Sequence, residues 1–176
     1  MVLKPVKKHY AVDRKLRREL AQLSDMAYLG EDCRDCASFR KGMRERGLAA
    51  SYDVIHELSD PDHVTFRNEK DNKTVVAFRG TRLGNTRDLW NDAAILFNFQ
   101  KYTSRFKSAE RVASDAIKRY GRENVLVTGH SLGGTQALHA AHKHGVETHA
   151  FNPGAGLPKF MFGLSGIVAH LSDKLG

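Results

Sequence analysis

The chain has no run of about eighteen apolar residues, the length that a membrane-spanning helix needs. Its first residues also lack the apolar core of a secretory signal peptide, because Lys4, Lys7 and Lys8 are followed by polar sequence. The 176 residues contain no internal repeat, low-complexity tract or linker. These absences predict a soluble protein with a single domain over residues 1–176 and a basic arm at about residues 1–12.

Cysteine is scarce: Cys33 and Cys36 form one C-x-x-C pair. A zinc site normally needs a second pair or histidines at defined spacing, and a thioredoxin-like motif follows a strand. Neither context is present, so the pair is interpreted as a turn disulfide or as two ordinary thiols. Half of a zinc site shared between subunits is the alternative. Two cysteines do not identify the cellular compartment.

Positive charge is in excess, with 28 basic and 20 acidic residues and a net charge of +8. In the first quarter of the chain the basic residues are Lys4, Lys7, Lys8, Arg14, Lys15, Arg17, Arg18, Arg40, Lys41, Arg44 and Arg46. Such a surface suits an anionic membrane. Nucleic acid or an acidic protein is the less favoured partner, and a solvated face without a partner is the third interpretation. The composition does not indicate an oligomeric state.

The most informative motif is the sequence VLVTGHSLGG at residues 125–134. An apolar strand runs through Gly-x-Ser-x-Gly into the helix-forming residues 135–143, which is typical of a nucleophile elbow. Glycines at 129 and 133 remove side chains that would collide at so sharp a turn. The motif predicts that Ser131 is a nucleophile, with an ordinary strand-to-helix turn capped by serine as the alternative.

A second apolar run, at residues 73–81, ends in Gly80 and Thr81 and predicts a strand beside the first. Acyl transfer needs donors aimed at the oxygen that becomes negative. The backbone N–H after the nucleophile, that of Leu132, would be one donor, and Thr81 would supply the other. Alternatively, Gly80 and Thr81 form only a turn.

Four motifs in order resemble the class 3 lipase family of α/β-hydrolases: VVAFRGT (75–81), DLWND (88–92), VLVTGHSLGG (125–134) and AFNPG (150–154). The similarity covers about residues 50–156, with a looser match at residues 20–29. It implies a serine-dependent esterase that acts on phospholipid or acylglycerol through an acyl-enzyme and needs no cofactor. In this resemblance Ser131 is the nucleophile and Thr81 lies in the oxyanion hole.

The sequence departs from the family pattern at the catalytic general base. In this fold the acid and the histidine follow the serine, and the candidate acid is Asp173, after the apolar run 166–171; Glu147 comes too early. No histidine follows Asp173, and His170 is a weak substitute. Either the chain stops short of a longer protein, or it is a catalytically incomplete lipase-like structural or interaction protein.

The expected fold is a small α/β-hydrolase, with a mostly parallel central sheet that has an antiparallel start and is flanked by helices. We expect helices at about 13–29, 38–46, 87–96 and 105–120, and strands at about 52–58 and 63–68 before the two already described.

Two apolar segments, 95–102 and 154–166, are candidates for acyl-chain contact through residues such as Phe99 and Phe162, although core packing explains them equally well. The resemblance implies that Asp88 and Asp92 anchor the helix after the oxyanion loop. The alternative of a metal site is less favoured, because calcium generally requires more oxygen ligands. No metal site is therefore predicted.

Overall fold

The computed structural model describes residues 13–30, 35–81 and 99–153. Within them, five strands form one sheet in the order β1-β2-β3-β4-β5: β1 (Asp53–Val54), β2 (His63–Asn68), β3 (Lys73–Phe78), β4 (Val125–His130) and β5 (Glu147–Phe151). The pairs β1/β2 and β2/β3 are antiparallel, whereas β3/β4 and β4/β5 are parallel. The predicted α/β fold with an antiparallel start is confirmed. A mostly parallel sheet was expected, and within the described residues the sheet is mixed, with as many antiparallel as parallel strand pairs.

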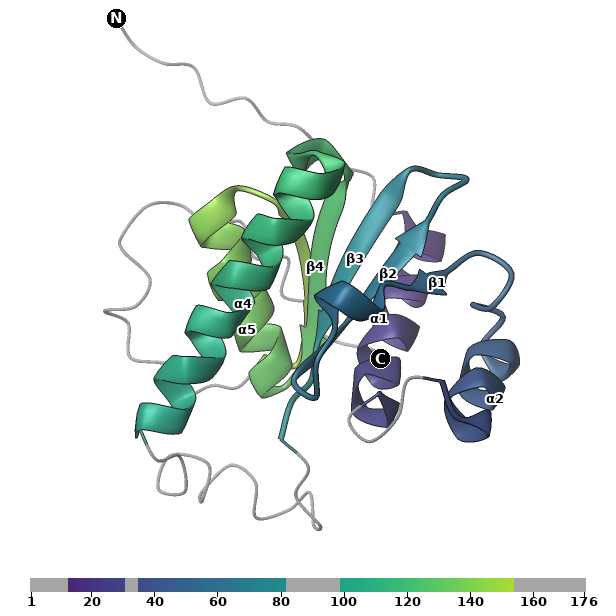
Figure 1. Ribbon diagram of the computed structural model, residues 1–176, viewed down its shortest axis with the longest axis horizontal. Helices are drawn as coiled ribbons and strands as arrows, with labels where there is room; N and C mark the ends of the chain where they lie inside the picture. The colour runs from purple at the N-terminus through teal and green to yellow at the C-terminus, as the bar shows by residue number, and fades with distance from the viewer. Residues whose placement is uncertain (1–12, 31–34, 82–98, 154–176) are drawn as a thin grey trace, which may run out of the picture.

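Helices cover both faces of this sheet (Figure 1). The helices α1 (Arg14–Leu29) and α2 (Ala37–Glu45) lie on one face, and α4 (Phe99–Tyr120) and α5 (Leu132–His144) lie on the other. Strand side chains alternate between two cores, as expected for a sheet buried on both sides. In β3, Val75 and Ala77 pack toward α1, whereas Val76 and Phe78 pack toward α4 and α5.

The first helix begins where the sequence predicts. Asp13 is its N-cap, and its carboxylate accepts hydrogen bonds from the backbone N–H groups of Lys15 and Leu16 at 2.9 and 3.2 Å. Near the middle of α1, the Ser24 hydroxyl lies 2.9 Å from that of Thr128 in β4, and Thr128 donates to the carbonyl of His149 in β5 at 2.8 Å. This buried polar chain ties α1 to two parallel strands.

The strand expected at residues 52–58 is wrong in its extent, because β1 has two residues and is followed by the 3₁₀ helix η1 (His56–Leu58). The reason is Ser59, whose hydroxyl donates to the Ile55 carbonyl at 2.7 Å and accepts from the Thr65 N–H at 2.9 Å. A side chain thus replaces the strand ladder at this point.

The helix expected at 105–120 begins earlier, at Phe99, and ends at Tyr120. The backbone of residues 99–102 therefore belongs to α4 rather than to a loop. After α4, Gly121 and the 3₁₀ helix η2 (Arg122–Asn124) lead into β4. The helix expected at 87–96, the remainder of the segment 95–102 and the segment 154–166 lie outside the described residues.

Candidate active site

Ser131 lies at the turn between β4 and α5, where the sequence predicts it. Its φ and ψ are 55° and −125°, a conformation that a residue with a side chain rarely adopts. Such strain persists only where the surroundings enforce it. Here the Ser131 N–H donates to the carbonyl of Phe151, at the end of β5, at 3.0 Å, and the Ser131 carbonyl accepts from the Thr135 N–H at 3.1 Å.

Two glycines make this turn sterically possible. A Cβ on Gly129 would lie 2.3 Å from the carbonyl carbon of Gly133. A Cβ on Gly133 would lie 2.1 Å from the carbonyl oxygen of Phe78 in β3. Both distances are far below van der Waals contact, so the spacing Gly-x-Ser-x-Gly is a steric requirement of this strand, turn and helix.

Leu132 is the first residue of α5 and is buried. A backbone N–H in the first turn of a helix has no acceptor within the helix. The partial positive charge of the helix N-terminus lies at the same place. The N–H of Leu132 is therefore a donor next to the Ser131 hydroxyl.

Thr81 follows β3 at the same edge of the sheet. In the parallel register Phe78 pairs with Gly129, so the chain leaves β3 beside the place where it leaves β4. A Cβ on Gly80 would lie 2.7 Å from the carbonyl oxygen of His130. The backbones of Gly80 and His130 are thus in contact, and Thr81 and Ser131 are the residues that follow them. The Thr81 hydroxyl oxygen is buried and has no partner among the described residues.

Tyr28, which the sequence analysis missed, closes the site from the α1 side. Its hydroxyl lies 3.3 Å from Nδ1 and 3.4 Å from the carbonyl oxygen of His130. The same oxygen would lie 2.2 Å from a Cβ on Gly80. Burial raises the pKa of the Tyr28 hydroxyl, an effect opposed by the Gly80 backbone and by the charges of Arg105 and Arg79. It therefore remains a neutral donor at neutral pH.

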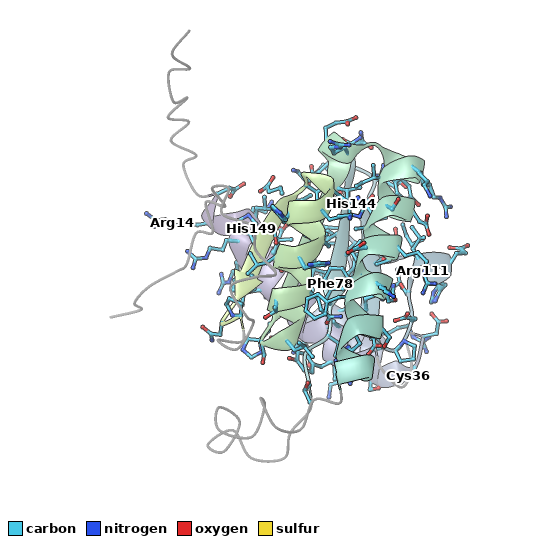
Figure 2. The ribbon with its side chains drawn as sticks, turned by 90° about the vertical axis from the view of Figure 1, so that its left-hand side faces the viewer. Arg14, Cys36, Phe78, Arg111, His144 and His149 are labelled. Carbon is cyan, nitrogen blue, oxygen red and sulfur yellow. The ribbon has the colours of Figure 1, made fainter. Side chains whose placement is uncertain are left out.

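A charged cluster, also missed by the sequence analysis, lies behind the end of β3. Arg79 and Arg105 both reach the carboxylate of Asp62, at 3.0 and 3.4 Å. Burial lowers the pKa of the Arg105 guanidinium and Asp62 opposes this, but arginine remains charged. The cluster carries two positive charges and one negative charge. Figure 2 labels Phe78, the residue before Arg79, which packs against α4 and α5.

Among the described residues, no histidine hydrogen-bonds to the Ser131 hydroxyl. Within the described ranges the Ser131 hydroxyl makes no hydrogen bond. The ring of His130 lies beside Tyr28, His139 pairs with Glu110 at 2.7 Å, and His149 pairs with Glu147 at 3.1 Å. The candidate acid Asp173 and its neighbour His170 lie outside the described residues, as do Asp88 and Asp92.

Cys36 precedes α2 and its sulfur lies 3.1 Å from the Ser38 hydroxyl, whereas Cys33 lies outside the described residues, so their pairing stays a prediction. Among the described residues, no three acidic, histidine or cysteine side chains are grouped so that they could bind a metal. No helix in this part of the chain is both long and apolar enough to cross a membrane.

Comparison with protein families gives a match between residues 19–169 and the model of the Tle-like phospholipase domain. Comparison with curated proteins gives no match.

Among solved structures, the lipase from Rhizopus microsporus var. chinensis is similar, with a TM-score of 0.56 and 21% identity over 82% of this chain and 58% of that one. The Rhizomucor miehei lipase in its propeptide complex gives a TM-score of 0.49 and 18% identity over 75% and 47%. The first likeness shows that the chain has the α/β-hydrolase fold of fungal lipases. The chain spans about half the length of these two structures.

Proposed function

The chain belongs to the Tle-like phospholipase domain family, and we propose that it hydrolyses carboxyl esters of phospholipids or acylglycerols through a covalent acyl-serine. One observation carries the proposal: Ser131 is held at φ 55° between β4 and α5, directly before the free donors of a helix N-terminus. A merely capping serine would hydrogen-bond to the N–H groups of its own helix, and Ser131 makes no such side-chain bond. Its hydroxyl is therefore available to act as the nucleophile.

In the proposed reaction, the Ser131 oxygen attacks the ester carbonyl carbon while a general base takes the hydroxyl proton. The tetrahedral intermediate then collapses, the bond to the alcohol oxygen breaks, and the base returns the proton to the departing alcohol. Water repeats the sequence on the acyl-enzyme and releases the fatty acid. Asp173 would orient a histidine base, for which the sequence offers only His170 near that acid.

The oxyanion of the intermediate would accept hydrogen bonds from the backbone N–H groups of Leu132 and Thr81, and from the Thr81 hydroxyl. Two observations support these roles. Leu132 begins α5, and the buried Thr81 oxygen lacks a partner within the described residues. Donors already in place cost no reorganisation during the reaction, and each contributes about 100- to 1000-fold to the rate.

The proposed substrate surface is an anionic membrane, which would contact α2. The buried face of α2 packs on the end of α1: a Cβ on Gly42 would lie 3.0 Å from Leu29 Cδ1. The opposite face exposes Arg40, Lys41 and Arg44. Leu29 is 37% exposed and follows Tyr28, whose hydroxyl touches the site. The basic face of α2 and the apolar side chain of Leu29 would thus both be available to an anionic membrane, on the side of the sheet that α1 and α2 cover (Figure 1).

Labelling with a fluorophosphonate tests the nucleophile, because the reagent forms a stable bond only with an activated serine. The wild-type chain is expected to be labelled at Ser131, as mapped by mass spectrometry of its peptides. Ser131→Ala is expected to lose the label, and Ser51→Ala, which removes an exposed serine far along the sequence, is expected to keep it. Equal labelling of wild type and Ser131→Ala, or none in either, would favour the alternative of a catalytically incomplete lipase-like scaffold.

A further inference from the structure

The end of β3 is tied to the turn before β2 by both backbone and side chain. The Arg79 N–H donates to the Asp62 carbonyl at 2.9 Å, and the Arg79 guanidinium reaches the Asp62 carboxylate at 3.0 Å. The Asp62 side chain is 36% exposed and that of Arg79 only 13% exposed. The residue two positions before Thr81 is thereby fixed on the side of β2.

Arg105 of α4 also contacts both Asp62 and Arg79. Its Nη2 lies 3.4 Å from the Asp62 carboxylate and also donates to the carbonyl oxygen of Arg79. The side chain is 7% exposed. The backbone carbonyl of Arg105 accepts a hydrogen bond from the side-chain amide of Gln136 in α5 at 3.2 Å. Arg105 is thus also connected to the helix that begins at Leu132. Arg105 therefore connects the β3 end to α4 through its guanidinium, and α4 to α5 through its backbone carbonyl.

The carbonyl of Arg79 matters because it belongs to the peptide unit that leads into Gly80. Fixing this oxygen fixes the plane of the peptide, and with it the direction in which the backbone continues to Thr81. Gly80 itself has no side chain that could hold the chain, and it lies against the His130 carbonyl and the Tyr28 hydroxyl. The orientation of the Thr81 donors thus depends on contacts made by its neighbours.

We propose that Arg105 is a positioning residue for the oxyanion donors of Thr81, acting through the carbonyl of Arg79, with Asp62 as the carboxylate that orients its guanidinium. This inference rests on the proposed function. Both contacts use Nη2, whose two N–H bonds lie at fixed angles in the guanidinium plane and can serve the carboxylate and the carbonyl together, whereas a lysine ammonium lacks this fixed planar geometry. The competing explanation is an ion pair that only holds α4 against the sheet.

Steady-state turnover of p-nitrophenyl butyrate by the full chain separates these explanations. Arg105→Gln is expected to lower kcat by up to about 100-fold, because a small misplacement of a donor weakens the transition state. KM should stay within about twofold, since the ground-state ester gains little from the oxyanion donors. Arg105→Lys should have a higher kcat than Arg105→Gln. Asp62→Asn should have a lower kcat than the wild type, as Arg105→Gln does. If the ion pair were purely structural, removing it would lower the unfolding temperature but would not lower kcat at a constant KM.

The matched control is Arg111→Gln, which removes an exposed arginine from the same helix (Figure 2). It should leave kcat, KM and the rate of fluorophosphonate labelling at the wild-type values. An equal loss in Arg111→Gln and Arg105→Gln would overturn the proposal, because the effect would then follow from charge on α4 rather than from the contact with Arg79.

Hydrogen–deuterium exchange of the peptide containing residues 78–81 gives a readout that needs no activity. Exchange in this peptide should be faster in Asp62→Asn and Arg105→Lys than in wild type and Arg111→Gln. If Arg105→Gln does not fold, the exchange rates and kcat values of Asp62→Asn and Arg105→Lys test the positioning role. Wild-type exchange in both, or wild-type kcat in a folded Arg105→Gln, would show that the inference is wrong. Absence of labelling in the wild type would instead refute the proposed function, while the exchange result still decides the positioning role.

Discussion

Gly133 and Phe78 are in direct backbone contact: a Cβ on Gly133 would lie 2.1 Å from the carbonyl oxygen of Phe78 and 2.9 Å from the carbonyl carbon of Arg79. The first turn of α5 therefore rests on the end of β3. Because Leu132 precedes Gly133 and Thr81 follows Arg79 closely, this contact sets the distance between the two proposed oxyanion donors.

Replacing Gly133 by alanine should destabilise the fold by about 3 kcal/mol, because the new methyl group meets the rigid backbone at the end of β3. The measurement is chemical denaturation followed by circular dichroism. Gly134→Ala is the matched control, since its nearest contact would be 3.0 Å, to the Gly129 carbonyl oxygen. There a gain in helix propensity of about 1 kcal/mol offsets much of the crowding. Equal stabilities for the two variants would contradict the close contact.

Ser131→Gly should raise the free energy of unfolding by about 1 to 2 kcal/mol relative to Ser131→Ala. Both variants delete the hydroxyl, but only glycine adopts φ 55° and ψ −125° without strain. Part of the gain is lost to the greater entropy of glycine in the unfolded chain. Thermal and chemical denaturation of the pair measure the difference. A Ser131→Gly variant less stable than Ser131→Ala would mean that the turn is relaxed.

Stability at acid pH should depend on Asp60, which lies in the turn before β2 and contacts His63 at 2.9 Å. Burial raises the pKa of Asp60, but the hydrogen bond and charge of His63 and two backbone N–H groups outweigh it, so the pKa lies below its ordinary value of about 3.9. A carboxylate with a lowered pKa stabilises the fold above the ordinary value, and this stabilisation is lost as the pH falls through the lowered one.

Wild type should therefore lose more stability than Asp60→Asn between about pH 5 and pH 2, by less than about 1 kcal/mol because the pair is partly exposed. Urea denaturation at a series of pH values provides the comparison. Asp53→Asn, which removes an exposed carboxylate from β1, is the charge-matched control. Parallel pH curves for wild type and Asp60→Asn would contradict the stabilising role of the His63 contact.

Binding to anionic vesicles should depend on α2. Replacing Arg40, Lys41 and Arg44 together by glutamine should weaken binding to phosphatidylglycerol vesicles by about 100-fold at low salt, at about 1 kcal/mol for each charge. Co-sedimentation at increasing ionic strength measures it. The control replaces the exposed Lys107, Arg111 and Lys118 of α4, with the same change in net charge. Equal weakening in both triple variants would show that net charge alone attracts the membrane.

The elbow could be predicted from the sequence because its requirements are local. A strand, two glycines, a serine and a helix must follow one another within about ten residues, and the steric reason for each glycine is visible in the spacing. The same holds for α1, whose N-cap at Asp13 is a local signal. The position of Thr81 was also predicted, because parallel neighbours end at one edge of a sheet.

Arg105 and Tyr28 could not be predicted, because their surroundings come from distant parts of the chain. An arginine in an amphipathic helix is ordinarily assigned to the solvent, and the burial of Arg105 is compensated by the Asp62 carboxylate and the Arg79 carbonyl. Tyr28 lies on α1, whose pattern predicts a helix packed on the core but not the group that its hydroxyl meets. The short β1 was mispredicted for a different, local reason: the Ser59 hydroxyl competes with the strand ladder through bonds to Ile55 and Thr65, four and six residues away.

The contact between Tyr28 and His130 joins positions that are 102 apart in the sequence, and the bond between Ser24 and Thr128 spans 104. Closing such large loops is slow compared with forming a helix or a hairpin. During synthesis, the early elements α1 to β3 are made before β4, so the contacts around Ser131 form only after β4 has been added. The proposed nucleophile consequently reaches its final geometry only at the end of folding, when nearly all of the described chain is in place.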